Sequence, residues 1–506
     1  MSLDAALLIA RSGLLHTQRA LSNAADNVAN AETDGYTRKR IVSEAVTAGE
    51  QGMGVRSLGP TRDVDNALLN ELNKRRSAKA AAELREGVLE IIDQAHGDPA
   101  NAEGLGDLVS KLRTGFIELR TDPAQVVKQQ AVVLNAAQRV VERFNDLSET
   151  IGHARQELHD ELVSKVAEVN ATLREIGVLK RGVMERTGAG APVADIEDKL
   201  DLAVARLGGF LEVKPLRQND GGMVLLGAGG ITIPTPESGD VFSLQNSLLA
   251  PDKYYGGAGN IPPILMNGAD VTKQMVGGKI GEAISLRDQT LPRYQAELDV
   301  AAAELADRFR AEGLRLFSDS VGTVPDPNLP YAGSAQIGFA DKIQVNPAVR
   351  SEVRLLRDGT ETIGGGAPFT PNPVGGPAGF VTLIDRILNY SFGETTSAGA
   401  SWGGFATSGL GPDGSLSSPF GSPRIIEDYV GLIAASQTAD SAQAKTDLET
   451  AEQFTDGLEA RFNRESRVDV DSELGSLIQL QNAYAANARV ISTAQSMWST
   501  LFDSVR

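Results

Sequence analysis

The chain has 506 residues, which is too many for a single hydrophobic core, so we expect several domains. Its formal net charge of −18 argues against nucleic-acid binding, because phosphate contacts need clustered lysine and arginine, and against attraction to anionic membranes. There are no cysteines, which excludes disulfides, thiolate nucleophiles and cysteine-based zinc sites.

The first segment of the chain is predicted to be a helix with a heptad seam, because apolar or small side chains recur every three or four residues. The seam comprises Leu3, Leu7, Ala10, Leu14, Thr17, Leu21, Ala24, Val28 and Ala31. This start lacks the basic region of a secretory signal, and no stretch of the chain approaches the roughly 20 apolar residues of a membrane span. We therefore expect neither a signal peptide nor membrane insertion.

Long helices are predicted to follow, at residues 63–96, 105–120, about 122–185, about 281–312 and about 424–464. Asp122-Pro123 is a typical helix start, with the aspartate as cap and the proline in the first position. These sequence-distant segments are expected to form one long helical bundle.

Two regions between the helices have a different character. Residues 208–233 alternate apolar and polar side chains around Asp220-Gly221, which predicts a β-hairpin. Residues 318–423 are rich in Gly, Pro, Ser and Thr, and we expect loops and irregular β structure on an exposed surface.

The last segment repeats the heptad pattern of the first, so the two ends of the chain are expected to pair. Its seam comprises Val470, Leu474, Leu477, Gln481, Tyr484, Ala488, Ile491, Gln495, Trp498, Leu501 and Val505. The predicted fold class is therefore α+β and multidomain, with a terminal α-helical coiled-coil pair, a long helical bundle, an inserted small β-rich domain and irregular loops. The predicted division is residues 1–62 with 465–506 as the terminal coiled-coil domain; 63–204 with 281–317 and 424–464 as the bundle; 205–280 as the β-rich domain; and 318–423 as the irregular region.

No catalytic constellation stands out in the sequence. His153 and His159 are six residues apart, so they do not share a helix face as a metal pair would, and we interpret the scattered histidines as solvated. The stretch Gly277-Gly278-Lys279-Ile280 fails as a phosphate loop because Ile280 stands where Ser or Thr must reach magnesium. We predict no enzyme activity and no catalytic, cofactor-binding or metal-binding residues.

The stretch LSNAADNVANAETDGYTRKR, residues 21–40, resembles the N-terminal signature of bacterial flagellar axial proteins. The matching residues are Asn27, Ala29, Asn30, Thr33, Gly35 and Tyr36, whereas Asp26 replaces the usual first asparagine. The C-terminal residues 466–502 are similar to the end of the hook-associated protein 1 (FlgK) family, in particular Glu473-Leu474, Leu477-Ile478, Gln481, Ala483-Tyr484 and residues 486–491.

An internal segment, residues 276–309, resembles the same family. The matching positions are Gly277, Gly278, Gly281, Arg287, Asp288, Leu291 and Pro292. The resemblance covers most of the chain except residues 318–423. The N-terminal signature is shared with rod and hook proteins, and the internal segment together with the C-terminus selects the hook–filament junction protein.

The resemblance implies a structural protein that is exported unfolded by the flagellar type III apparatus and assembles as a ring at the hook tip, where it is required for filament assembly and motility. It implies an extracellular location in the flagellum after a cytoplasmic stage. The implied partners are the hook protein, the second hook-associated protein, further subunits of the ring and a dedicated export chaperone at the C-terminal helix. The alternatives are another axial protein of rod or hook type, or a secreted adhesin or enzyme with a helical stalk.

The resemblance also implies two sets of assembly residues. The axial assembly interface would comprise Leu3, Leu7, Leu14, Leu21, Asn27, Val28, Asn30, Thr33, Gly35 and Tyr36. The C-terminal assembly and chaperone-binding helix would use Leu474, Leu477, Ile478, Gln481, Tyr484, Asn487, Arg489, Ile491, Trp498 and Leu501. Small residues would let neighbouring helices approach closely, the asparagines would bond to the backbone where the helix meets the turn, and Gly35 would supply a positive-φ exit.

Overall fold

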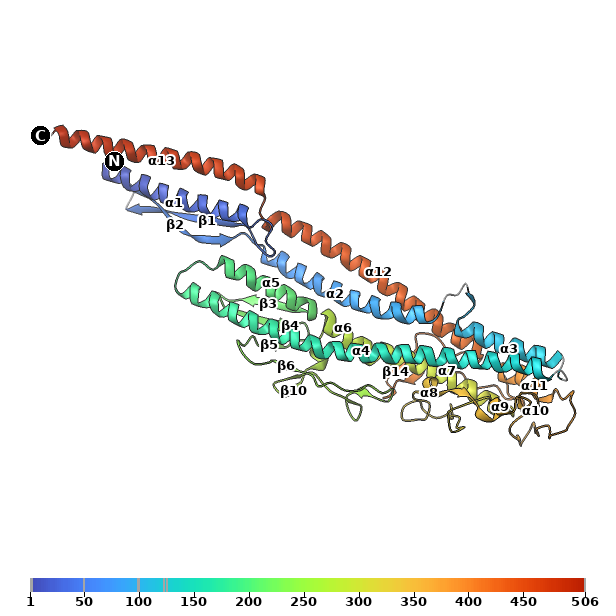
Figure 1. Ribbon diagram of the computed structural model, residues 1–506. Coiled ribbons are helices and arrows are strands. Elements are labelled where there is room, and N and C mark those ends of the chain that lie inside the picture. The colour runs from blue at the N-terminus through green and yellow to red at the C-terminus, as the bar shows by residue number, and fades with distance from the viewer. Residues whose placement is uncertain (1–2, 49–50, 98–100, 122, 124–125, 505–506) are drawn as a thin grey trace.

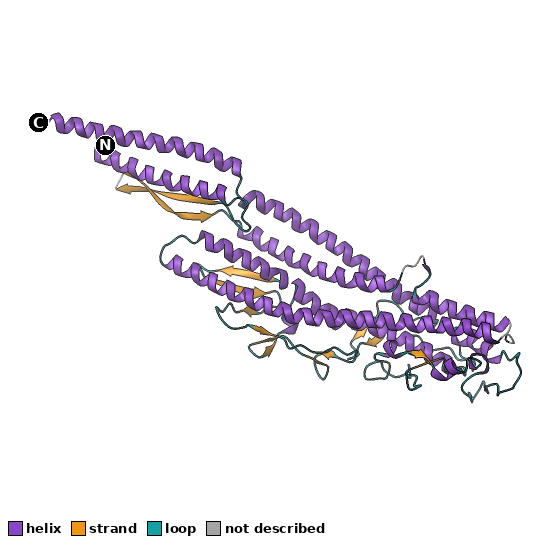
Figure 2. Cartoon of the chain, in the orientation of Figure 1, coloured by secondary structure: helices purple, strands orange, loops and turns teal. Residues whose placement is uncertain are grey.

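The computed structural model describes residues 3–48, 51–97, 101–121, 123 and 126–504. It is an elongated α+β molecule of several parts in which long helices run side by side (Figures 1 and 2). The first and last helices lie together at one end of the molecule (Figure 1). None of the helices in the described ranges is long and apolar enough to cross a membrane.

The bundle is built from helices of widely separated sequence. They are α2 (Asn66–Ala95), α3 (Leu105–Thr121), α4 (Val126–Gly188), α5 (Ala194–Phe210), α6 (Gly278–Ser285), α7 (Leu291–Ala311) and α12 (Ile426–Ser466). The predicted long helices are confirmed, with the segment at about 281–312 divided between α6 and α7, whereas α5 was not predicted and ends inside the region assigned to the β-rich domain from residue 205. Asp65 caps α2 by accepting hydrogen bonds from the backbone N–H groups of Ala67 and Leu68. The predicted cap of α4, Asp122, lies outside the described residues.

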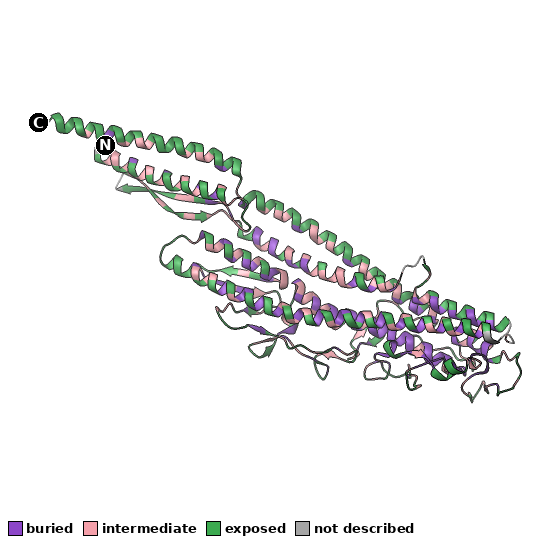
Figure 3. Ribbon diagram, in the orientation of Figure 1, coloured by how far each residue is buried: buried purple, intermediate pink, exposed green. Residues whose placement is uncertain are grey.

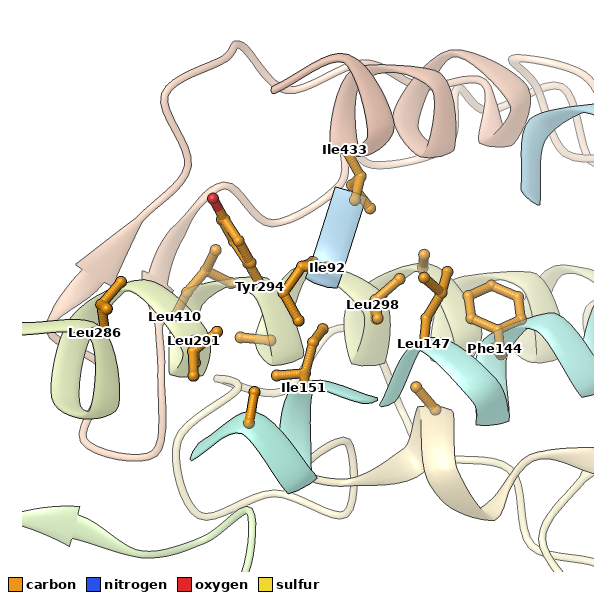
Figure 4. Packing of buried hydrophobic residues seen from close by; sticks show 14 of the residues in the cluster. Ile92, Phe144, Leu147, Ile151, Leu286, Leu291, Tyr294, Leu298, Leu410 and Ile433 are labelled. Carbon is orange, nitrogen blue, oxygen red and sulfur yellow. The ribbon is translucent and has the colours of Figure 1, made fainter. Parts of the chain in front are cut away.

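The core of the bundle runs along α4, whose heptad-like positions are buried as the sequence predicts. Phe144, Leu147 and Ile151 point towards Tyr294 and Leu298 of α7, with Ile92 of α2 and Ile433 of α12 completing the cluster (Figure 4). Two consecutive four-residue steps, from Leu158 through Leu162 to Val166, interrupt the heptad-like pattern, yet all three side chains stay buried, so this irregularity does not turn the helix away from the core. Burial of this apolar stripe is what holds the separate segments together.

The internal segment that resembles the hook-associated family, residues 276–309, comprises α6, the turn after it and most of α7, and its start packs against the end of α5. Gly278 has φ +59°, and a Cβ there would lie 2.4 Å from the carbonyl carbon of Phe210, so only glycine fits this approach. A π-helical turn (Leu286–Thr290) follows α6 and carries Arg287, which is fully buried and bonds to both carboxylate oxygens of Asp288 at 2.8 and 2.7 Å. This segment is therefore part of the interior.

Two histidines correct the interpretation of these residues as solvated. His159 is fully buried in α4, where its Nδ1 accepts from the guanidinium of Arg287 at 3.2 Å, since arginine can only donate. His96 is also buried, 2.7 Å from the side-chain oxygen of Gln437. Burial lowers the pKa of both imidazoles. Their neighbours come from distant segments, so the sequence did not reveal them.

The terminal part consists of α1 (Leu3–Ala29), α13 (Val470–Ser504) and an antiparallel hairpin of β1 (Lys39–Ala48) and β2 (Gln51–Arg62). The prediction that the end helices pair is confirmed, because α1 and α13 pack along their lengths. The hairpin was not predicted in residues 1–62, which were assigned to a coiled coil alone. It packs against α1. The available signal was the cluster of β-branched residues at positions 41, 42, 46 and 47, with glycines following.

Small sheets occupy the region between α5 and α6. The predicted hairpin at Asp220-Gly221 is confirmed: β3 (Val213–Arg217) pairs antiparallel with β4 (Met223–Gly227), and Gly221 has φ +82°. The other strands are β5 (Thr232–Ile233), β6 (Phe242–Ser243), β7 (Tyr254–Tyr255), β8 (Asn260–Ile261), β9 (Leu265–Met266) and β10 (Ala269–Asp270). The sheet orders are β3-β4-β5, β10-β9-β6 and β7-β8.

Residues 318–423 are more ordered and more buried than the sequence predicted. They contain α8 (Phe339–Lys342), α9 (Pro347–Ser351), α10 (Leu355–Asp358), α11 (Thr382–Arg386), β13 (Ser408–Leu410) and β14 (Leu416–Ser417), and β11 (Phe317–Ser318) pairs with β12 (Gln344–Val345). Phe339, Phe369 and Phe392 are buried in the main core. The expectation of a purely exposed surface is wrong, because isolated apolar residues between short turns dock onto the bundle. Asp299 on α7 holds this region by accepting hydrogen bonds from Gln295, Tyr331, Gly338 and Ala340.

Candidate functional site

The N-terminal signature folds into a turn that is fastened by Asn27. This side chain is fully buried at the end of α1, donates to the carbonyl of Lys39 at 2.8 Å, and accepts from the Tyr36 hydroxyl at 3.0 Å and the Lys39 N–H at 3.2 Å. Gly35 has φ +74° between these partners, as expected for the exit of the turn. Asn27 thus bonds to the backbone where helix meets turn, and Asn23 donates to the same Lys39 carbonyl at 2.7 Å.

Asn30 and Thr33 lie on the outer side of the turn. The Asn30 amide donates to the Asp26 carbonyl at 2.9 Å, and the Thr33 hydroxyl points at the Asn30 oxygen at 3.4 Å. The Thr33 side chain is exposed. Within one subunit these two residues finish the helix and bond to no other element.

Lys39 carries the turn onto the start of α5. Its Nζ lies 2.6 Å from Asp195, 3.1 Å from Asp198 and 3.5 Å from the centroid of the Tyr36 ring. Burial by itself would lower the pKa of Lys39, but the hydrogen bond to Asp195 and the charge of Asp198 outweigh it, so the pKa lies above its ordinary value. Lys39 therefore stays charged in a nearly closed setting.

Asp198 gathers further donors from the same part of the chain. It accepts from the Thr37 hydroxyl at 2.6 Å and forms an ion pair with Arg62, whose Nε lies 3.0 Å from Oδ1 and donates to the Thr37 hydroxyl at 3.3 Å. Arg62, at the end of β2, also bonds to Asp201, which pairs in turn with Arg217 of β3. Acids one turn apart on α5 thus meet Lys39 of β1 and Arg62 of β2, with Arg217 of β3 at the edge. We call Thr37, Lys39, Arg62, Asp195, Asp198 and Asp201 the polar hub.

The opposite side of the same backbone binds the C-terminal segment. Arg38 Nε donates to Glu473 at 2.7 Å, and the Arg38 N–H donates to the Ser466 carbonyl at 2.8 Å. The Glu473 side chain is only 4% exposed, so Arg38 provides its counter-charge. The break between α12 and α13 is therefore fixed to the N-terminal turn.

The N-terminal seam residues lie where α1 meets its neighbours. Ala10, Thr17 and Ala24 are buried, and Leu7, Leu14, Leu21 and Val28 are half-buried. A Cβ added to Gly13 would come within 3.2 Å of the Asn487 side chain, which shows how closely α13 approaches. The Leu3 side chain lies outside the described residues. Leu8 and Leu15, which the sequence did not single out, are exposed on the remaining face.

The C-terminal helix turns a narrower face towards α1 than its sequence predicts. Leu477, Asn487, Ile491 and Trp498 are half-buried, and Ala494 is buried. The remaining named residues of this helix are exposed, namely Leu474, Ile478, Gln481, Tyr484, Arg489 and Leu501. Val505, the last residue of the predicted seam, lies outside the described residues. Figure 3 shows the outer face of α13 as almost continuously exposed. Six of the ten predicted assembly residues of this helix thus remain accessible.

The hairpin packs against α1 mainly through β2, with hydrogen bonds to Ser12 and His16 of the helix. The Ser12 hydroxyl donates to the Ile9 carbonyl at 2.9 Å and accepts from the Val55 N–H at 3.1 Å. His16 Nδ1 lies 2.9 Å from the Ser57 hydroxyl. Gly54, with φ +112°, lies directly over Ser12.

A pocket of about 530 Å³ opens beside the turn, between Asn30, Asp34 and Lys39 on one side and Asp195 and Lys199 on the other. Its described lining contains no serine, cysteine or histidine. Across the described residues, no group of three or more His, Cys, Asp or Glu side chains is arranged to hold a metal ion. The polar hub is suited to fastening segments together.

The sequence pointed to Asn27, Gly35 and Tyr36 of the turn, but it did not reveal the distant acids that bind the residues directly after them, Thr37 and Arg38. Asp198 is separated from Thr37 by 161 residues, and Glu473 from Arg38 by 435 residues. The one available signal was the run of acids at 195, 197, 198 and 201 at the start of a helix.

Comparison with known families gives matches along most of the chain. The model described as the flagellar hook-associated protein FlgK helical domain matches residues 89–313. The model of the flagellar basal body rod FlgEFG protein C-terminus matches residues 460–503, and that of the flagella basal body rod protein matches residues 7–37. The last two ranges fall on the helices that pair, α13 and α1.

Two relatives named flagellar hook-associated protein 1 align over nearly the whole chain. The protein of Bacillus subtilis is 25% identical, with 95% of this chain and 94% of the relative covered. The protein of Salmonella typhimurium is 24% identical, with 98% of both chains covered. A solved structure, the flagellar hook junction protein FlgK from Burkholderia pseudomallei, is 18% identical, with a TM-score of 0.42 over 50% of this chain and 47% of that one.

Proposed function

The chain belongs to the flagellar hook-associated protein 1 family, and on that premise we propose that it is a structural protein of the junction between the flagellar hook and filament. The observation that carries the proposal is the pairing of α1 with α13, which brings both ends of the chain to one end of the molecule as a slender helical unit. We further propose that the protein acts by assembly alone and catalyses no reaction.

We propose that the terminal elements form the assembly domain and that the bundle, the β-rich region and residues 318–423 lie outside it. The exposed apolar side chains support this division. Leu474, Ile478 and Leu501 on α13 are each at least 46% exposed, with Leu8 and Leu15 on the free face of α1. Apolar surface of this kind marks an interaction site. Neighbouring subunits of a ring would cover it.

The residues predicted as an axial interface divide into two roles in this proposal. Asn27, Gly35 and Tyr36 shape the turn inside one subunit, whereas Thr33 is exposed and the half-buried Asn30 lines the pocket beside it, where a neighbour could reach both. Leu7, Leu14, Leu21 and Val28 hold α1 between α13 and the hairpin. Leu3 belongs to the proposed interface by sequence only.

We propose that the chain is exported unfolded through the flagellar type III apparatus and that its partners are the hook protein, the second hook-associated protein and further copies of itself. An export chaperone at α13 would cover the exposed Ile478, Tyr484 and Leu501 before assembly. The absence of cysteines supports export, since no disulfide can form in an unfolded chain that moves between redox compartments.

The test is electron microscopy of cells that lack this gene, together with an assay for flagellin in the medium. The proposal predicts hooks without filaments and flagellin lost to the medium. Missing hooks would move the protein to the rod or hook. Normal filaments would refute a junction role. Complementation with the intact gene is the control.

A further inference from the structure

The terminal unit, made of α1, β1, β2 and α13, is joined to the rest of the molecule by two short links. β2 ends at Arg62 and α2 begins at Asn66, while α12 ends at Ser466 and α13 begins at Val470. Each link leaves three residues, whose φ and ψ angles are free to rotate unless other contacts fix them. The direction of the terminal unit therefore depends on side chains that bridge the links.

Residues 37–39, where the chain enters β1 at Lys39, supply such a bridge on both sides of the backbone. Successive side chains of a strand point in opposite directions. Thr37 and Lys39 accordingly face α5 and bind Asp198, at 2.6 and 3.1 Å, whereas Arg38 faces the other way and binds Glu473 of α13 at 2.7 Å.

We propose that residues 37–39 are a two-sided clamp: Thr37 and Lys39 fix the terminal unit to α5 of the bundle, and Arg38 holds the start of α13 at this fixed point, so that together they set the direction of α13 relative to the bundle. One side grips α5 through Asp198, and the other grips the first turn of α13 through Glu473. The clamp goes beyond the proposed junction role and does not depend on it.

Burial makes both sides of the clamp effective. The side chains of Lys39 and Asp198 are 4% and 8% exposed, and that of Glu473 is 4% exposed. Removing Arg38 leaves the Glu473 charge unpaired in a poorly solvated place, and removing Lys39 leaves Asp198 to share Arg62 with Asp201, so either change favours movement of the segment into water. Buried pairs are also screened little by salt, so the clamp holds at high ionic strength.

The neighbouring residue provides a matched control. Arg40 is the next base along β1, but its side chain is 67% exposed and its nearest acid, Asp63, lies 4.0 Å away. Arg40→Gln removes the same charge as Arg38→Gln or Lys39→Gln without touching the clamp. Exposed pairs contribute little.

The test is a distance measurement by pulsed electron paramagnetic resonance on the full-length chain. Since the chain has no cysteines, spin labels attach only at introduced ones, Glu185→Cys on α4 and Gln479→Cys on α13, both at exposed positions. The intact clamp predicts one narrow distance distribution, at low and high salt alike. Arg38→Gln and Lys39→Gln should each lose that single peak, and Arg40→Gln should keep it.

A narrow peak retained in both clamp variants would overturn the proposal, as would a broad distribution in the unaltered chain. Circular dichroism separates release from unfolding, because release leaves the helical content unchanged. If Lys39→Gln loses helical content, Asp198→Asn removes the partner carboxylate on α5 and must broaden the distance distribution in the same way.

Discussion

Gly54 offers a direct test of how the hairpin is held on α1. An irregularity in the register pairs Val46 with Gly54 and Thr47 with Gly52, and it leaves Gly54 at φ +112°, where side chains rarely fit. A Cβ at Gly54 would lie 2.1 Å from the Ser12 hydroxyl and 3.4 Å from Ile9 Cα. Gly54→Ala should therefore loosen the hairpin.

The expected loss follows from two separate costs. Holding a non-glycine residue in this backbone conformation costs about 1–3 kcal/mol. Moving the Ser12 hydroxyl aside breaks the hydrogen bond from the Val55 N–H, which costs about 0.5–1.5 kcal/mol more. Together they give about 1.5–4.5 kcal/mol, or roughly a 10- to 2,000-fold loss of protection against local opening.

Native-state hydrogen exchange of the β1 and β2 amides measures this loss, because the bundle need not unfold for the hairpin to open. Gly52→Ala is the matched control: it lies in the same strand, meets nothing within 4 Å and does not have a positive φ. It should leave protection equal or raise it by up to about 1 kcal/mol.

A second variant separates the two costs. Ser12→Ala alone removes the hydroxyl that accepts from the Val55 N–H but leaves the Gly54 backbone unstrained, so protection should fall by only about 0.5–1.5 kcal/mol, the hydrogen-bond part of the loss. Protection equal to that of the unaltered chain in Gly54→Ala itself would refute the reasoning, because it would mean that the hairpin does not sit on Ser12 in solution.

Two further predictions concern the bundle. Gly278→Ala should lower the free energy of unfolding by about 2–5 kcal/mol, because it combines a positive φ with a Cβ 2.4 Å from the Phe210 backbone. The control, Gly209→Ala in α5, has open space around it and should be neutral or stabilising. Urea unfolding measures both variants, and equal midpoints would contradict this packing. Burial raises the pKa of Asp299 to about 6, despite hydrogen bonds from Ala340 and three other donors. This folded-state pKa lies above the unfolded value, so the associated stability is present at low pH and is lost as the pH rises through about 6. Between pH 5.2 and pH 7 the unaltered chain should lose about 1 kcal/mol of unfolding free energy relative to Asp299→Asn, which has no carboxyl to ionise. A difference between the two proteins that stays constant over this range would contradict the burial of this carboxyl.

Much of the helical architecture is readable from sequence, because it rests on periodic patterns within continuous segments. Helices α1, α4 and α13 each carry an apolar stripe long enough to identify them, and the matching heptads at both ends predicted their pairing. The hairpin at Asp220-Gly221 was predictable for a similar reason, since a short turn signal lies between alternating residues.

The candidate site was predictable on one side only. Asn27 and Gly35 stand out because their chemistry is local: the asparagine bonds to backbone 12 residues away, and the glycine supplies a positive φ. The half-burial of Leu477 and the exposure of Leu474 were not predictable, because the face that α13 turns to α1 is chosen by the packing partner.

The sequence by itself determined which segments are helices, that the chain ends pair and that residues 27–36 form a special turn. Tertiary structure alone decided what that turn binds. In the sequence, Asp198 and Glu473 look like ordinary surface acids. They become buried partners of Lys39 and Arg38 only when the fold brings distant segments together: Thr37 and Asp198 are 161 residues apart, and Arg38 and Glu473 are 435 residues apart. Ion pairs have no periodicity along the chain, since they depend on distances in space, and the fold has to form before they exist.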